Sequence, residues 1–253
     1  MKKKIFLLLF CLFITSCTTS LDNSKQDSLT QTNNDPLESY NRVMTNFNFK
    51  VNRYVYDPVA KVYRNVIPSF MRTGISNFGS NLSEPYVFVN AILQCEPKSA
   101  AHSLGRFFTN TTLGLGGLFD VASHFEIEKK KRNFAQTLYK WGWKGTSTYF
   151  VLPFLGPSDF RETVGMTVGW FLDPIDYVLP RKDRWRLRIG RYTINGIITI
   201  EEATDLLTGI ETSSVDPYAT LRTMYQQNKQ KFLNDGDIEA QSESYNFEFD
   251  LDD

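Results

Sequence analysis

The hydrophobic and polar positions of this chain follow helical spacing over long stretches. Apolar side chains recur every three or four positions in residues 36–56, as Leu37, Tyr40, Met44, Phe47, Val51 and Val55. The same period appears in residues 192–210 and again after Asp216, where Gly236 lies just past the last periodic residue. Apolar residues at this spacing form one face of an α-helix. We therefore expect a mainly α protein.

Four Asp-Pro dipeptides mark expected helix starts: Asp35-Pro36, Asp57-Pro58, Asp173-Pro174 and Asp216-Pro217. Asp accepts hydrogen bonds from the free N–H groups of a first turn, and Pro at the first helical position has a suitable φ. Their spacing predicts short and medium helices. No apolar stretch after Cys17 is long enough to span a bilayer, which requires about 20 residues. Membrane contact is therefore expected through amphipathic helices.

The first residues have the polarity of a secretory signal peptide. Three lysines at positions 2–4 precede an apolar stretch, Ile5–Ile14, that is too short to span a membrane. Ile14-Thr15-Ser16-Cys17 follows and resembles the lipobox of bacterial lipoproteins, in which the cysteine is acylated and becomes the new N-terminus. We expect cleavage before Cys17, with a short uncleaved anchor as the alternative. Thr18, in place of Asp, favours the outer membrane by the same resemblance.

Composition divides the chain into four expected segments. Residues 1–16 are the signal peptide, and 17–34 are the lipidated Cys17 followed by a flexible tether of mostly polar residues. Residues 35–234 form the helical domain. Residues 235–253 hold eight acidic and no basic residues, so we expect a disordered tail. The tail would either meet a basic partner or serve solubility alone.

After signal cleavage the chain retains two cysteines, Cys17 and Cys95. If Cys17 is acylated, no internal disulfide can form. We expect Cys95 to be a small buried residue.

The helix expected at 36–56 carries a second stripe that is polar but uncharged, formed by Asn41, Thr45, Asn48 and Asn52. Solvated helix faces usually carry Lys and Glu, and Asn is a weak helix former. One interpretation is the lining of a wet path for a zwitterionic or anionic lipid headgroup. Phe49, about 100° around the helix from Asn48, is then the candidate constriction. The alternative is an ordinary exposed face or a set of buried helix contacts.

Gly114, Gly116 and Gly117 lie in a glycine-rich block that spans Asn110–Asp120. The block lacks the GxGxxG order and follows no convincing strand, which disfavours a nucleotide site. Glycines here favour close backbone packing or a positive φ. They are also candidates for the lipid path.

Six basic residues alternate with apolar ones between Arg181 and Arg191. Because an exported protein does not meet nucleic acid, the functional interpretation is contact with membrane headgroups. The alternative is a solvated linker face. The candidates for the membrane surface are Arg181, Lys182, Arg184, Trp185, Arg186 and Arg188.

Signals of catalysis and metal binding are missing from the sequence. His102 and His124 are the only histidines, and neither has a second histidine at ligand spacing. Residues 156–160 begin like a nucleophile elbow around Ser158 but lack the closing glycine. We expect no catalytic residue, no metal and no cofactor, with a Ser-His-Asp lipid hydrolase as the alternative.

Ordered fragments from Asp35 to Gly236 resemble the MlaA/VacJ family of outer-membrane lipoproteins. They include Asp35-Pro36-Leu37-Glu38, Asn46-Phe47-Asn48-Phe49, Arg106-Phe107-Phe108, the Asn110–Asp120 block and Ser214-Val215-Asp216-Pro217-Tyr218. Each fragment is short, and their order and spacing together make the resemblance specific.

The chain departs from the family pattern at three places. Cys95 and Ala135 each stand where the family usually has glycine, and Ser147-Thr148 replaces a Gly-Pro pair. Gly142 and Gly145 remain the hinge candidates of the 140–149 loop.

The resemblance implies a single ring-like domain of short amphipathic helices around a central channel, lodged in the outer membrane beside trimeric porins. It implies removal of misplaced phospholipids from the outer leaflet and their delivery to a soluble periplasmic lipid carrier. This would maintain the lipid asymmetry of the outer membrane. Moving two acyl chains through water would cost on the order of 20 kcal/mol at ~0.8 kcal/mol per CH₂, so a channel is physically sensible. A structural lipoprotein that braces porins is the alternative.

Overall fold

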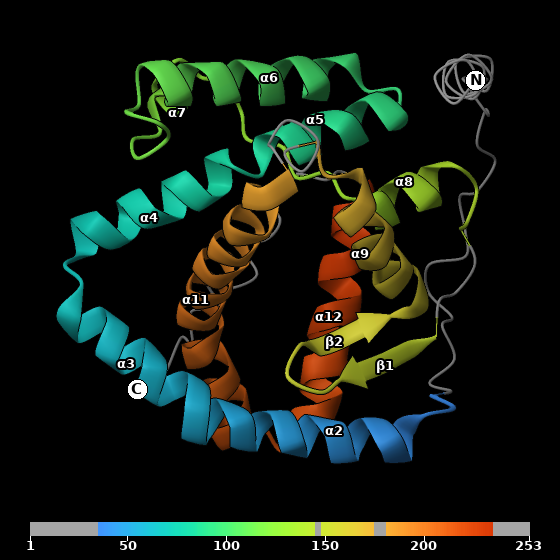
Figure 1. Ribbon diagram of the computed structural model, residues 1–253. Helices are drawn as coiled ribbons and strands as arrows, with labels where there is room; N and C mark the ends of the chain where they lie inside the picture. The colour runs from blue at the N-terminus through green and yellow to red at the C-terminus, as the bar shows by residue number, and fades with distance from the viewer. Residues whose placement is uncertain (1–34, 145–147, 175–180, 235–253) are drawn as a thin grey trace, which may run out of the picture. The chain divides into compact units, whose positions relative to one another are not determined.

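The computed structural model describes residues 35–144, 148–174 and 181–234 (Figure 1). The expected signal peptide, the lipidated Cys17, the tether and the acidic tail lie outside these residues. The chain divides into two units, Met1–Pro36 and Leu37–Asp253, and the second contains the described helices and strands.

The mainly α fold expected from the sequence is confirmed. The helices are α2 (Glu38–Val51), the π-helix η1 (Asn52–Tyr56), α3 (Asp57–Val66), α4 (Ser69–Asn81), α5 (Glu84–Leu93), α6 (Pro97–Thr112), α7 (Val121–His124), α8 (Phe134–Lys140), α9 (Phe160–Leu172), α11 (Arg181–Ser213) and α12 (Pro217–Asn234). None of the described helices combines the length and apolar character needed to cross a membrane.

The Asp-Pro dipeptides have different roles in the structure. Asp216 begins α12 as predicted, because its carboxylate accepts a hydrogen bond from the Ala219 N–H at 3.1 Å. Asp57 is the first residue of α3, but no break in the helical backbone precedes it. α2 continues through η1 into α3, and the Asp57 N–H bonds to the Asn52 carbonyl five residues back. Asp173 follows the last residue of α9 as its C-cap, so it marks a helix end.

A β-hairpin is present where the sequence pattern predicted no strand. β1 (Tyr149–Leu152) pairs antiparallel with β2 (Gly156–Asp159). The connection turns tightly, with Phe154 and Gly156 both at positive φ. Four-residue strands are too short for a clear period-2 pattern, so the sequence pattern does not predict the hairpin.

The elements of the second unit pack in a closed circuit (Figure 1). α2 lies along β1, β2 contacts α9, α9 packs on α8, and α8 contacts α5. From α5 the contacts continue through α6 and α4 to α11, which packs on α3 and η1. The apolar core is small, with Tyr149, Val151 and Tyr218 at its centre. The helices therefore follow one another around a circuit and do not stack about one large apolar core.

Candidate functional site: an apolar exterior and a polar pocket

The helix α3 directs its apolar face away from the protein. Val59, Val62 and Val66 lie on one stripe and are 44%, 63% and 67% exposed. The opposite face carries Ala60, which is buried, and Arg64, which contacts α11. A helix at a water-facing surface normally has the reverse arrangement.

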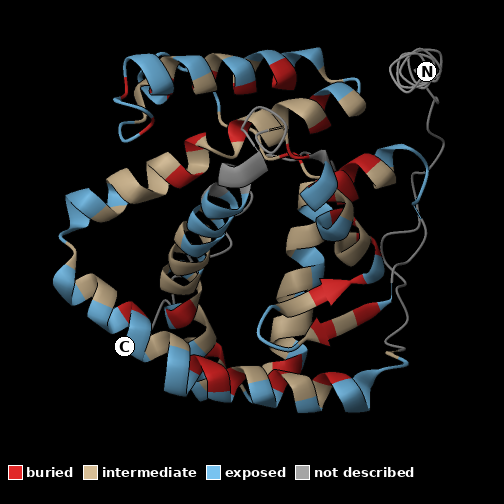
Figure 2. Cartoon of the chain, viewed as in Figure 1, coloured by how far each residue is buried: buried red, intermediate tan, exposed pale blue. Residues whose placement is uncertain are grey.

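Other elements repeat this pattern, and pale blue exposed positions recur along α2 and α3 in Figure 2. Of the apolar stripe in residues 36–56, Tyr40, Phe47 and Val55 are 45%, 37% and 50% exposed, whereas Val51 is buried. Soluble monomers rarely expose contiguous apolar patches above a few hundred Å². Further exposed apolar side chains are Val43, Tyr54, Phe70, Met71, Phe108, Leu113, Leu115, Phe119, Trp170, Phe171, Trp185 and Ile189.

Polar side chains make up much of what the described residues bury. Nineteen polar or charged residues are buried, against 13 hydrophobic residues, of which five are alanine. Each buried polar group needs a hydrogen bond to offset its desolvation. The described helices are therefore joined largely by polar contacts.

The polar stripe of α2 supplies several of these contacts. Asn41 is fully buried; its amide donates to the Tyr149 carbonyl at 3.3 Å and accepts from the Val151 N–H at 2.9 Å. Asn48 makes the same pair of bonds farther along, to the Leu152 carbonyl and the Phe154 N–H. Both asparagines thus bond to backbone groups of the hairpin, as a third strand along β1 would. These bonds match the alternative interpretation of the polar stripe, which was a set of buried helix contacts.

The other members of this set are equally enclosed. Asn52 is 1% exposed and donates to the Thr208 hydroxyl on α11 at 3.1 Å, while Thr45 is 1% exposed. Phe49, the candidate constriction, is 4% exposed. In this conformation Asn41, Thr45, Phe49 and Asn52 do not present open surface to a ligand, and a lipid path along them stays a prediction.

The glycine-rich block follows a helix, α6, and not a strand. A Cβ on Gly114 would lie 2.2 Å from the Phe119 carbonyl oxygen, and one on Gly117 would lie 2.6 Å from the Asn81 amide. Gly116 and Gly117 have positive φ values of 73° and 99°. Close packing and positive φ therefore account for these glycines, as one sequence interpretation proposed. Their part in a lipid path is not tested by this geometry.

Arg106 forms a closed polar network with the end of this block. Its guanidinium is 3% exposed and donates to Glu84 at 3.2 Å and to both carboxylate oxygens of Asp120 at 2.8 and 2.7 Å. It also donates to the Ser123 hydroxyl and, at 2.6 Å, to the Ile127 carbonyl. All three nitrogens are engaged, so Arg106 joins α5, α6 and α7.

The two carboxyl groups around Arg106 shift in opposite directions. Desolvation raises the pKa of Glu84 to about 7, despite the nearby positive charge of Arg106. For Asp120, desolvation is outweighed by hydrogen bonds from Ser123, Arg106 and Asn110, which lower its pKa to about 2. Asp120 is therefore the permanent anion of the network, and Glu84 is its titratable member near neutral pH.

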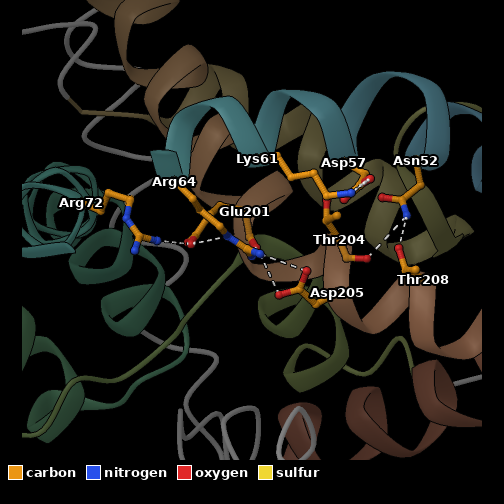
Figure 3. A network of polar contacts seen from close by, with 9 residues as sticks. All are labelled: Asn52, Asp57, Lys61, Arg64, Arg72, Glu201, Thr204, Asp205 and Thr208. Atoms are coloured by element: carbon orange, nitrogen blue, oxygen red, sulfur yellow. Dashed lines mark hydrogen bonds and ion pairs between the residues drawn. The ribbon is translucent and has the colours of Figure 1, made fainter. Parts of the chain in front are cut away.

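A second polar network joins α3 and α4 to α11 (Figure 3). Arg64 donates to Glu201 at 3.0 Å and to Asp205 at 3.0 and 2.8 Å, and Arg72 donates to the same Glu201 oxygen at 2.5 Å. The arginines point toward Glu201 from two different helices (Figure 3). Unlike the Arg106 network, this one is partly open, since the Arg64 and Arg72 side chains are 30% and 26% exposed.

A pocket of about 270 Å³ lies beside this network. It is lined by Tyr63 of α3, by Ser69, Arg72, Thr73, Ser76 and Asn77 of α4, and by Ile198, Glu201 and Glu202 of α11. None of these residues was a candidate site residue on the basis of the sequence. One available signal was the spacing of Ser69, Arg72, Thr73 and Ser76, which places them on one face of α4.

The basic stretch and the hinge candidates are only partly described. Trp185, Arg186 and Arg188 are exposed at the start of α11, while the side chains of Arg181, Lys182 and Arg184 lie outside the described set. Contact with membrane headgroups stays a prediction for all six. Gly142 has a φ of 106° with open space around it, and Gly145 is outside the described residues.

The expectation for Cys95 is wrong. Cys95 is exposed and has a φ of 56°, in the left-handed region that favours glycine. This explains why glycine is common in the family pattern at that position.

Ser158 lies in a contact set without a histidine. It is 2% exposed, and its hydroxyl is 3.2 Å from the Thr163 hydroxyl. Among the described residues no hydrogen bond joins Ser158 to His102 or His124, and no group of three or more His, Cys, Asp or Glu side chains could hold a metal ion. The described geometry contains no triad around Ser158.

Together, the exposed apolar side chains, the polar contacts between helices and the circuit of helices define a class of protein whose outer face suits a lipid surface. A family model described as MlaA lipoprotein matches residues 33–232. The chain belongs to this MlaA lipoprotein family, as the order of its sequence fragments indicated.

Curated relatives and a solved structure agree with this assignment. The chain is 36% identical over 215 residues to the intermembrane phospholipid transport system lipoprotein MlaA of Escherichia coli, covering 83% of each chain. The protein with the same description in Haemophilus influenzae is 34% identical over 254 residues, covering 96% of each. A solved structure described as "Structural basis for maintenance of bacterial outer membrane lipid asymmetry" is 35% identical with a TM-score of 0.64, covering 79% of this chain and 98% of that one.

Proposed function

We propose that this chain is an outer-membrane lipoprotein that removes mislocalised phospholipids from the outer leaflet and thereby maintains lipid asymmetry. The observation that carries the proposal is the inverted side-chain distribution: apolar residues are exposed along α3 and at several positions of α2, and many contacts between helices are polar. Such a body can lie among lipids while offering polar groups to a headgroup. The names of the relatives, which concern phospholipid transport, support the same function.

We further propose a route, partners and a membrane anchor for this function. Lipids pass through an amphipathic channel within the helical domain to a soluble periplasmic carrier, and a trimeric porin lies beside the protein. Cys17 supplies the lipid anchor, and the acidic tail meets the carrier. The protein acts as a conduit and not as an enzyme, because lipid transfer requires no bond to be made or broken.

The test is the amount of phospholipid in the outer leaflet of cells that lack the gene. We expect it to rise on deletion and to return to the normal level with the wild-type gene, but not with a Cys17→Ser gene. Stable membrane attachment requires more than one anchoring signal. An unchanged outer leaflet in the deletion strain would instead identify a structural protein that braces porins.

A matched pair on α3 tests the apolar exterior. Val62→Asp places a charge on the outward face, where hydrocarbon contact would cost about 2 kcal/mol or more. Asn65→Asp introduces the same negative charge at an exposed polar position of the same helix. We expect Val62→Asp alone to lower membrane retention and restore asymmetry poorly, at matched expression. Equal behaviour of the two variants would show that the valine face lies in water.

A further inference from the structure

The pocket between α3, α4 and α11 is small and mostly polar. Its volume of about 270 Å³ lies just below the roughly 300–1,000 Å³ of sites for drug-sized ligands. Ile198 is the one aliphatic residue among the described residues that line it. The pocket therefore suits a small polar group and not an acyl chain.

One side of the pocket offers hydrogen-bond donors and positive charge. Ser69, Arg72, Thr73 and Ser76 line it from a single face of α4. The Nε atom of Arg72 is buried and has no hydrogen-bond partner among the described residues. α4 begins at Ser69, and its N-cap, Pro68, offers no side-chain hydrogen bond. A helix N-terminus beside an arginine favours a phosphate group.

The other side of the pocket offers negative charge and an aromatic ring. Glu201 and Glu202 line it from α11, and Tyr63 lines it from α3. The Tyr63 hydroxyl is buried without a hydrogen-bond partner among the described residues. Desolvation raises the pKa of Tyr63, so it stays a neutral phenol. Carboxylates and an aromatic ring together attract an ammonium group.

We propose that this pocket binds a zwitterionic headgroup of the phosphoethanolamine type. Its phosphate lies against Arg72 and the hydroxyl groups of α4, and its ammonium group lies against Glu202 and Tyr63. The inference rests on the proposed function, since it names the headgroup class that this lipid transporter selects. Glu201 is already paired with Arg64 and Arg72, so an anionic headgroup that lacks the amine would leave Glu202 facing a phosphate of the same charge.

Soluble headgroup analogues separate the sources of binding. The full-length protein in detergent micelles is titrated by calorimetry with glycerophosphoethanolamine, glycerophosphoglycerol and inorganic phosphate. We expect glycerophosphoethanolamine to bind about fivefold more tightly than glycerophosphoglycerol, a phosphodiester that lacks the amine, because this is the ratio that one partly exposed charge pair contributes. Equal binding of the three probes would mean that the pocket is a phosphate site alone. Absence of binding by all three would also overturn the proposal.

Variants on one helix identify the groups responsible. Glu202→Gln removes a pocket charge and should abolish the fivefold preference. Glu211→Gln is the control, because Glu211 lies on the same helix and pairs with Arg53 outside the pocket. Arg72→Gln should weaken the binding of glycerophosphoethanolamine and of glycerophosphoglycerol equally, because both carry the same phosphodiester charge. If Arg72→Gln lowers the melting temperature too far for titration, Glu202→Gln still decides. A preference that survives Glu202→Gln refutes the assignment.

Lipid-transfer assays test the headgroup preference separately from the proposed transport function. Wild-type protein should extract phosphatidylethanolamine from vesicles faster than phosphatidylglycerol, and Glu202→Gln should reduce that difference. Equal rates for both lipids would refute headgroup selection and leave transport intact. If neither lipid is extracted and outer-leaflet phospholipid is normal in the deletion strain, the proposed function is wrong. Binding of the headgroup analogues in micelles then tests the pocket independently of transport.

Discussion

The Arg106 network and the Arg72 network use the same residue types in different surroundings. Arg106 is almost fully buried, and each of its nitrogens has a partner, including Glu84 and Asp120. Arg72 is 26% exposed, donates to Glu201, and keeps a buried Nε without a partner among the described residues. A satisfied arginine in a closed site holds helices together, whereas an incompletely satisfied arginine beside a pocket can bind a ligand. The difference between these two networks is therefore that Arg72 keeps an unused donor beside a pocket, whereas Arg106 has none.

The largest expected effect comes from removing the closed arginine. Arg106→Met leaves Asp120 charged and without its partner, and should lower the free energy of unfolding by about 3–5 kcal/mol. Arg72→Met should lower it by less than about 1 kcal/mol, because a partly exposed pair contributes little. Denaturant unfolding in detergent micelles measures both values. Similar losses for the two variants would remove the distinction between the networks.

A second effect concerns the pH dependence of the closed network. The pKa of Glu84 is raised from 4.5 to about 7, so the folded protein holds this proton more tightly than the unfolded chain. The resulting stability is complete below pH 4.5 and is lost as the pH rises through 7, by up to about 3 kcal/mol.

Melting temperatures between pH 4.5 and 8 test this effect. The wild-type value should fall over that range, and Glu84→Gln should flatten the curve. The positive charges of Arg106 and Lys129 both act to lower the pKa of Glu84, and the Asp120 contribution is lost only as the pH falls from about 4 toward 2. A wild-type curve as flat as that of the variant would show that Glu84 does not titrate there.

A third, smaller effect is the difference in stability between losing a buried and losing a partly exposed asparagine on α2. Asn41→Ala leaves the Tyr149 carbonyl and the Val151 N–H unpaired in a buried place and should cost about 2 kcal/mol. Asn48→Ala frees similar groups where water can replace the amide, so about 1 kcal/mol is expected. Unfolding of the two variants under identical conditions measures the difference. An equal cost would mean that burial does not set the strength of these contacts.

The smallest effect sets the lower limit of the comparison. Arg53 pairs with Glu211 at 2.8 Å, with the arginine side chain 56% exposed. Glu211→Gln should cost less than about 1 kcal/mol, and added salt should reduce the cost further. Unfolding at low and high ionic strength checks both statements. A cost above that of Arg72→Met would contradict the ordering by burial.

Local features of the sequence foretold the helices well and the hairpin poorly. The periodic segment after Asp216 became α12 because both its Asp-Pro start and its apolar spacing act within a few residues. The same reasoning placed a helix start at Asp57, where α3 does begin, but it did not show that the π-helix η1 joins α2 to α3 without a break. It also missed β1, whose stability depends on distant contacts with Asn41 and Asn48.

The sequence by itself determined the helical period, the two faces of α2 and the family resemblance. Only the tertiary structure decided which face points inward. Helical spacing defines two stripes equally well, but the direction of each depends on what packs against it. Here β1 presents backbone groups that asparagine can bond, so the polar stripe is buried and much of the apolar one is exposed.

The pocket shows the same limit most clearly. Arg64 and Arg72 meet Glu201 across 137 and 129 positions of sequence. No local pattern encodes such a separation, because the chain between these residues first has to fold around the whole circuit of helices. Charge and spacing supplied the residues, and the packing of α11 against α3 and α4 brought them together into a site.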